Sequence, residues 1–108
     1  MAKGYNYIVI FVTTPSISLA RKISKTLISK RLVACSNIVK GVNSIFFWKG
    51  RVEDSKECLL IMKSQERLFK KIEKEVRRLH NYEVPEVIAI PIVDGSKPYL
   101  DWVKETLV

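Results

Sequence analysis

Histidine, cysteine, glycine and proline are all scarce in this sequence of 108 residues, which has one His, two Cys, four Gly and four Pro. With 47% hydrophobic and 28% charged residues, the composition excludes a collagen-like or low-complexity chain and fits one globular domain over residues 1–108. The sequence also lacks a Gly-x-Ser-x-Gly elbow, a phosphate-binding loop and a dinucleotide-binding fingerprint. We therefore expect that the protein is not an enzyme.

A long hydrophobic run is missing as well. The longest apolar stretch, Tyr7 to Val12, is far shorter than the roughly 20 residues that a helix needs to cross a bilayer. The first residues contain no apolar core of the kind found in signal peptides. We expect no membrane insertion and a cytoplasmic location.

Acidic residues are absent from the first half of the chain. Residues 1–52 contain nine Lys or Arg residues and no Asp or Glu, the first acid being Glu53, and the net charge of the whole chain is +8. This asymmetry could reflect an anionic partner, either nucleic acid, acidic lipid or acidic protein. Because no run exceeds two adjacent basic residues, a solvated basic surface is the interpretation that we favour.

The first half predicts a strand, a helix and a hairpin. Residues 5–12 are dense in Tyr, Ile, Val and Phe, which suits a strand buried on both faces. Thr14 and Pro15 supply a start signal for a helix over residues 16–31. Residues 32–48 and 51–63 then read as two strands around Lys49 and Gly50, and glycine readily takes the positive φ of a tight turn.

The first arm of this hairpin is too long for the domain, since at about 3.3 Å per residue it would extend for roughly 50 Å. Gly41 could mark a bulge that divides the arm, or the outer hairpin, with Phe46, Phe47 and Trp48, could project beyond its own core. The two are compatible. A projecting hairpin with exposed aromatic side chains invites pairing with another chain, so we expect an oligomer.

The second half predicts a helix, a strand and a last helix. Ser64 can cap a helix in which apolar residues recur at three- and four-residue spacing from Phe69 to Leu79. Residues 87–93 form a strand, and Ser96 with Pro98 opens a short helix over residues 99–107. The complete order predicts an α+β, ferredoxin-like split β-α-β sandwich with a long central hairpin and a C-terminal helix.

The two cysteines do not predict a disulfide. If Trp48 pairs with Arg51 across the turn, Cys58 lies opposite Gly41, roughly 20 Å along the strand from Cys35, which is too far for the bond. Cys58 stands in an apolar run and is expected in the core. The thiol of Cys35, just before the apolar pattern loosens, could reach a pocket.

The only histidine, His80, begins a segment that contains Tyr82, Glu83 and Glu86. An imidazole, a phenol and carboxylates crowded into a loop that also holds Pro85 could bind a cation or a small ligand. A histidine in the last turn of a helix more often interacts only with the carbonyl groups at the helix end. From the spacing alone, the second interpretation is favoured.

Nucleic acid is not an expected partner. RNA-recognition domains share this order of elements and stack bases on aromatic residues of their two central strands. The expected strand over residues 51–63 has no aromatic residue, and nothing matches the signature of those domains.

Several segments together resemble the CutA divalent-cation-tolerance family, over nearly the whole chain. The matching pieces are Thr13-Thr14-Pro15, residues 32–38, residues 44–50, residues 57–63, residues 80–86, and Pro91 with Gly95, Tyr99, Leu100 and Trp102. The resemblance implies a homotrimer in which long hairpins extend sheets between subunits, with a pocket at each interface.

The resemblance also implies a function in tolerance of divalent metal cations, notably copper. By matching positions, Cys35, His80 and Glu86 would be metal ligands, and Trp48, Tyr82, Tyr99 and Trp102 would line the ligand pocket. The cation, Cu²⁺ or another divalent ion, would bind weakly and would not be required for folding. An alternative is a scaffold or signalling trimer like the PII proteins, which would bind a small anionic ligand or a protein partner.

Overall fold

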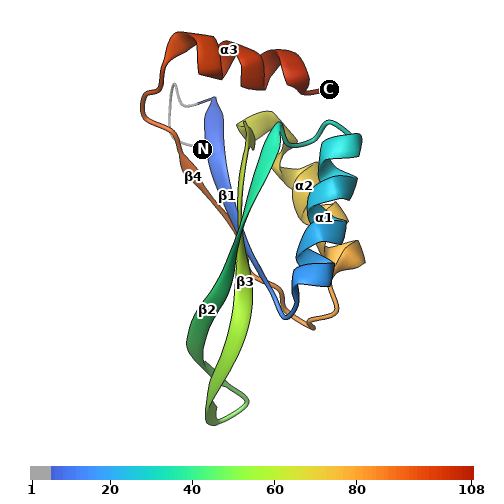
Figure 1. Ribbon diagram of the computed structural model, residues 1–108, viewed down its shortest axis with the longest axis vertical. Helices are drawn as coiled ribbons and strands as arrows, with labels where there is room; N and C mark the ends of the chain where they lie inside the picture. The colour runs from blue at the N-terminus through green and yellow to red at the C-terminus, as the bar shows by residue number, and fades with distance from the viewer. Residues whose placement is uncertain (1–5) are drawn as a thin grey trace.

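A four-stranded antiparallel sheet with the strand order β2-β3-β1-β4 forms the centre of the molecule in the computed structural model, which describes residues 6–108. The strands are β1 (Tyr7–Thr14), β2 (Cys35–Trp48), β3 (Arg51–Gln65) and β4 (Val87–Pro91). Helices α1 (Ile17–Ser29) and α2 (Phe69–Leu79), the latter after a 3₁₀ turn at Glu66–Leu68, cover one face, and α3 (Lys97–Thr106) crosses one end (Figure 1). The predicted fold class is confirmed.

The core lies between the sheet and the two helices. Alternate residues of β1, namely Ile8, Ile10 and Val12, are fully buried against apolar side chains of α1 and α2 such as Ile23 and Ile72. The other residues of β1 are only half-buried, because no helix covers the second face of the sheet. Within one chain, the prediction that this strand is buried on both faces therefore holds fully for one face and in part for the other, and its predicted start at residue 5 lies outside the described residues.

The hairpin has both features that its length suggested. Trp48 pairs with Arg51 across a two-residue turn whose residues, Lys49 and Gly50, have φ of 50° and 80°. The pairing shifts between Val39 and Val42, where Gly41 has φ of 72°, so a bulge interrupts the ladder. The outer hairpin extends beyond the helices (Figure 1) and gives the molecule a longest dimension of 44 Å.

Two predicted helix caps are wrong, and in both cases the strand runs further than expected. Ser16, not Thr14, caps α1, and its Oγ accepts a hydrogen bond of 3.1 Å from the Leu19 amide. Ser64 belongs to β3, is fully buried, and donates a hydrogen bond of 2.6 Å to the Leu32 carbonyl. Thr14 and Ser64 both lie within the paired ladder of β1 and β3, which continues to the ends of these strands.

The C-terminal helix closes one end of the core with Val103, which is buried, and is followed by buried Leu107. Val108 donates its amide to the Arg31 carbonyl at 2.9 Å, which ties the end of the chain to the loop after α1. Cys58 is buried as expected. None of the helices within residues 6–108 combines the length and the apolar character needed to span a bilayer.

Candidate functional site

A groove of about 770 Å³ lies between the outer hairpin and the loop that follows α2. The hairpin contributes one wall, and residues 81–84 and Glu86 contribute the other. Thr13, at the end of β1, adds to the lining. The hairpin side consists of Ser44, Ile45, Phe46, Trp48, Glu53, Ser55 and Glu57.

The innermost carboxylate of this groove is Glu57, which is only 6% exposed. The hydroxyl of Tyr82 donates a hydrogen bond of 2.5 Å to Glu57 Oε2. Burial, together with the hydrogen bond to Glu57 and its negative charge, raises the pKa of Tyr82 above its ordinary value. The phenol therefore stays protonated and remains a donor at neutral pH.

Three further carboxylates, those of Glu53, Glu83 and Glu86, line the same groove. Glu86 is exposed as a residue, but partial burial of its carboxyl group, followed by the charge of Glu57, raises its pKa. The ammonium group of Lys49 lies 3.5 Å from Glu83 Oε1 at the outer rim, where both side chains are largely exposed. Arg51 Nε likewise lies 3.6 Å from Glu53 Oε2. Within residues 6–108, the negative charge without a cationic partner is therefore that of Glu57 and Glu86, deeper in the groove, and it would favour a cation.

His80 lies behind the groove and fixes the loop. It is 8% exposed and forms the C-cap of α2. The Tyr82 amide donates to Nδ1 at 3.1 Å, so Nε2 carries the proton and donates to the Thr13 carbonyl at 2.7 Å. Both ring nitrogens of His80 are therefore engaged, and its ring packs beside that of Tyr82 with centroids 4.6 Å apart.

Cys35, Tyr99 and Trp102 lie at the other end of the sheet. The Cys35 thiol and the Tyr99 hydroxyl are 3.5 Å apart, and the ring of Tyr99 lies 5.7 Å from that of Trp102. The hydrogen bond with Cys35, followed by burial, raises the pKa of Tyr99 to about 12.

The structure therefore divides the seven predicted site residues into two groups within one chain. Cys35 pairs with Lys63, which pairs with Val9, so Cys35 is level with Val9 of β1. His80 contacts Thr13, four residues further along β1. Cys35 and His80 are therefore separated by roughly 13 Å along the strand direction. Trp48, Tyr82 and Glu86 line the groove with His80 behind them. Across residues 6–108, no group of three or more His, Cys, Asp or Glu side chains is arranged to hold a metal ion.

The sequence reasoning missed the acidic wall of the groove. Glu53, Ser55 and Glu57 alternate along β3, so their side chains share one face of the strand. This alternation of polar residues with a period of two was the sequence signal that could have identified the acidic wall. It was overlooked because the bulge near Gly41 and the course of the loop after α2, which bring Glu57 and Tyr82 together, depend on tertiary structure.

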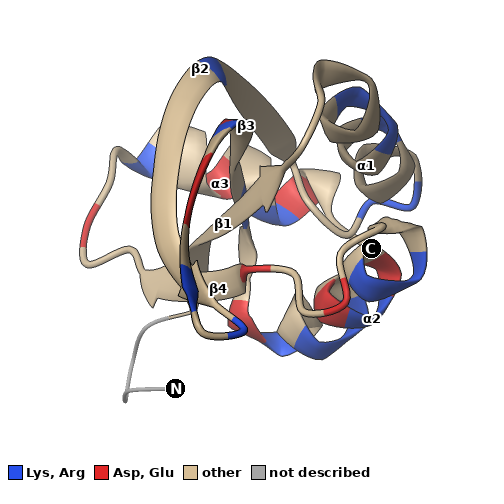
Figure 2. Ribbon diagram, turned by 90° about the horizontal axis from the view of Figure 1, so that it is seen from below, with Lys and Arg blue, Asp and Glu red and all other residues tan. Residues whose placement is uncertain are grey.

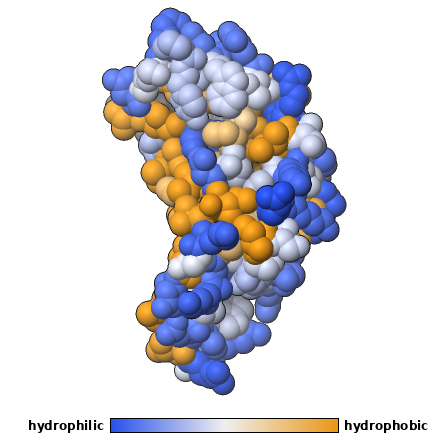
Figure 3. Space-filling view, in the orientation of Figure 1, coloured by the Kyte–Doolittle hydropathy of each residue, from blue (hydrophilic) through white to orange (hydrophobic). Residues whose placement is uncertain are grey.

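The face of the sheet opposite the helices exposes apolar side chains. Val39, Ile88 and Ile90 on this face are each between 43% and 51% exposed. Phe47 and Val52, which are at least 70% exposed, lie on the other side of the outer hairpin, because Val52 shares its side of β3 with buried Cys58. Figure 3 shows apolar residues gathered over the sheet, with hydrophilic residues along the edge formed by the helices. Monomers rarely leave so much connected apolar surface in water, so this face has the character of an interface.

Comparisons with known proteins agree with each other. Residues 8–106 match the family model described as "CutA1 divalent ion tolerance protein". The chain is 45% identical over 97 residues to the divalent-cation tolerance protein CutA of Thermus thermophilus, covering 90% of this chain and 94% of the relative. Protein CutA of Homo sapiens is 42% identical over 95 residues, which are 88% of this chain and 53% of the relative, so the chain spans about half of that protein.

Solved structures give the same result. The structure of CutA1 from Oryza sativa superposes with a TM-score of 0.93 at 39% identity, covering 96% of this chain and 95% of that one. The structure of the divalent cation tolerance protein of Thermus thermophilus superposes with a TM-score of 0.92 at 43% identity, covering 94% of this chain and 99% of that one.

Proposed function

Because this chain belongs to the CutA1 divalent ion tolerance protein family, we propose that it acts in the tolerance of divalent cations by binding them at the groove between the outer hairpin and the loop after α2. The cation is Cu²⁺ or another divalent ion, bound weakly, and the site is completed between the subunits of a homotrimer. The proposal assigns no catalytic step to the protein.

The observation that carries this proposal is the pair of carboxylates, Glu57 and Glu86, that lie in one groove without a Lys or Arg partner among residues 6–108, in a chain whose net charge is +8. Glu57 and Glu86 are near enough for the charge of one to raise the pKa of the other. A divalent cation between them would relieve that repulsion, and the protein would then hold it through charge as well as coordination.

The donor set within one chain is incomplete, which is why the proposal includes a second subunit. Carboxylates alone suit hard cations, whereas copper favours imidazole and thiolate ligands. Both nitrogens of His80 are engaged in hydrogen bonds, so the ring would bind a metal only after the Tyr82 or Thr13 contact opened. Cys35 borders the face of the sheet opposite the helices, which we call the open sheet face. A neighbouring subunit packed on that face could bring its own Cys35 thiol to the groove of this chain.

The apolar character of the open sheet face supports the trimer. Covering Val39, Ile88, Ile90 and the outer hairpin with other subunits would remove apolar surface from water at about 25 cal/mol per Å². A small anionic ligand, the alternative that the resemblance to PII proteins suggests, is disfavoured for this groove because Glu57 and Glu86 would repel it.

Equilibrium titration with Cu²⁺ and with Zn²⁺, in competition with a chelator of known affinity, tests the proposal. We expect Glu57→Gln with Glu86→Gln to weaken binding at least tenfold, because the amides preserve size and the hydrogen bond to Tyr82 but remove both charges. Asp101→Asn with Glu105→Gln, which removes two acids of α3 outside the groove, is the matched control and should bind as the wild type does.

A second double variant, Cys35→Ala with His80→Ala, tests the ligands taken from the resemblance. It should weaken the binding of Cu²⁺ more than that of Zn²⁺, if its circular dichroism spectrum is native. Equal binding by the wild type and by both double variants would remove the groove as a cation site.

A further inference from the structure

The whole net charge of the protein resides on its helix layer, which we define as α1 with the two residues after it (17–31) and α2 (69–79). This layer holds ten of the 19 Lys and Arg residues and two of the 11 Asp and Glu residues, so the nine basic and nine acidic residues elsewhere balance. The sequence places the excess in the first half of the chain, but in space it covers one side of the molecule. Figure 2 shows the basic residues of α1 and α2 on the side away from the sheet.

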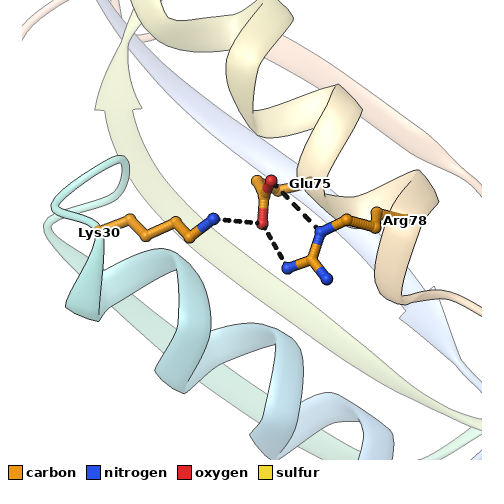
Figure 4. A network of polar contacts seen from close by, with 3 residues as sticks. All are labelled: Lys30, Glu75 and Arg78. Carbon is orange, nitrogen blue, oxygen red and sulfur yellow. Dashed lines mark hydrogen bonds and ion pairs between the residues drawn. The ribbon is translucent and has the colours of Figure 1, made fainter.

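The apolar sides of both helices pack on the sheet, which leaves their basic sides to solvent. Four of the ten basic residues have partners: Lys30 and Arg78 both bind Glu75, at 3.0 and 2.8 Å (Figure 4), Lys70 lies 3.9 Å from Glu73, and Arg31 donates to carbonyls of α3. The other six are exposed and form no ion pair with any residue of the described chain, 6–108. They are Arg21, Lys22 and Lys25 on α1 and Lys71, Lys74 and Arg77 on α2.

The arrangement of these six cations suits a polyanion with fixed charges. They form two short rows, about 6 Å long on α1 (residues 21–25) and about 9 Å long on α2 (residues 71–77), on neighbouring helices of one layer. Double-stranded nucleic acid carries one negative charge per about 1.7 Å of its axis, so a patch of six such cations can meet several phosphates at once. The headgroups of a lipid bilayer, in contrast, carry no fixed spacing.

We propose that the helix layer binds the phosphate backbones of double-stranded nucleic acid without reading its sequence. None of the exposed aromatic side chains among residues 6–108 belongs to α1 or α2, so the layer offers no platform for stacking single-stranded bases. The expectation of no nucleic-acid partner rested on the lack of aromatic residues for base stacking on the sheet, and the basic surface was interpreted as solvated. Contact with phosphates needs exposed Lys and Arg alone, and it is independent of the cation groove.

The test measures binding of the whole protein to a fluorescent duplex of mixed sequence by anisotropy, at KCl concentrations from about 50 to 200 mM. Six phosphate contacts predict that log K falls with log [KCl] with a slope of about −5. The variant Lys22→Gln, Lys25→Gln, Lys74→Gln should bind at least tenfold more weakly at about 100 mM KCl and reduce the slope by about 3.

The matched control is Lys40→Gln, Lys56→Gln, Lys104→Gln, which removes the same charge from exposed positions outside the helix layer. It should retain affinity within threefold and keep the slope. Equal losses in the two triple variants would show that only net charge matters and would overturn the proposal. So would binding to vesicles of phosphatidylcholine and phosphatidylserine without binding to the duplex.

Discussion

Removing the hydroxyl of Tyr82 tests whether the buried charge of Glu57 is held by the loop after α2. In Tyr82→Phe, the 2.5 Å hydrogen bond to Glu57 Oε2 is lost, and a carboxylate that is 6% exposed loses its donor. Hydrogen bonds to charged groups contribute about 1.5 to 3 kcal/mol, so we expect the free energy of unfolding to fall by about 2 kcal/mol. For a domain of this size, that corresponds to a decrease in melting temperature of roughly 10 °C.

Urea denaturation followed by circular dichroism, at one protein concentration because oligomers gain stability by mass action, measures the effect. The double-mutant cycle of Tyr82→Phe with Glu57→Ala, which removes the acceptor of this bond, isolates the pair, and we expect a coupling of about 1.5 kcal/mol. A loss below about 0.5 kcal/mol in Tyr82→Phe, which is typical of surface changes, would refute the assignment of this bond as the anchor of the loop.

Three further substitutions test separate parts of the structure. Because the pKa of Glu86 is raised, its protonated form contributes stability below the ordinary pKa of 4.5, and that contribution is lost as the pH rises through the raised pKa. Glu86→Gln should therefore stabilise the protein at pH 7, by only about 0.3 kcal/mol because the carboxyl group is largely exposed. Under acid conditions the same substitution should give no gain. Urea denaturation at pH 7 and under acid conditions measures the effect, and a change in stability that is the same at both pH values would contradict the prediction. Gly50→Ala, at φ of 80° with open space around the added methyl group, should cost about 1 kcal/mol of backbone strain in thermal melting, and an unchanged melting temperature would mean that the turn can relax. His80→Ala removes two hydrogen bonds from a buried ring and should cost about 2 kcal/mol in urea denaturation, whereas wild-type stability would be inconsistent with its role in fixing the loop.

Local chemistry carried most of the fold prediction. Gly50 identifies the turn because glycine takes positive φ without a steric cost, and Gly41 identifies the bulge for the same reason. The positive φ of Lys49 has no such signal, since it is uncommon for a residue other than glycine. The caps failed because Thr14 and Ser64 carry the same hydroxyl that starts a helix or ends a strand. Only the ladder bonds and the buried Leu32 carbonyl decide between these roles.

The candidate site was harder to predict because its parts meet only in the folded chain. Trp48, Tyr82 and Glu86 do line one groove, whereas Cys35 lies at the far end of the sheet. Glu57 stands beside a run of core residues, and its partner Tyr82 follows 25 positions later. No spacing rule joins two such residues, so the acidic wall appeared only with the three-dimensional register.

Native mass spectrometry in the presence of Cu²⁺ tests the central claim, that cations bind at the acidic groove of an oligomer, most directly. The account predicts a species of three times the 12.5 kDa chain that carries copper, and the same trimer with little or no copper when Glu57→Gln and Glu86→Gln are combined. A monomer, or a trimer that retains the same number of copper ions after both substitutions, would contradict it.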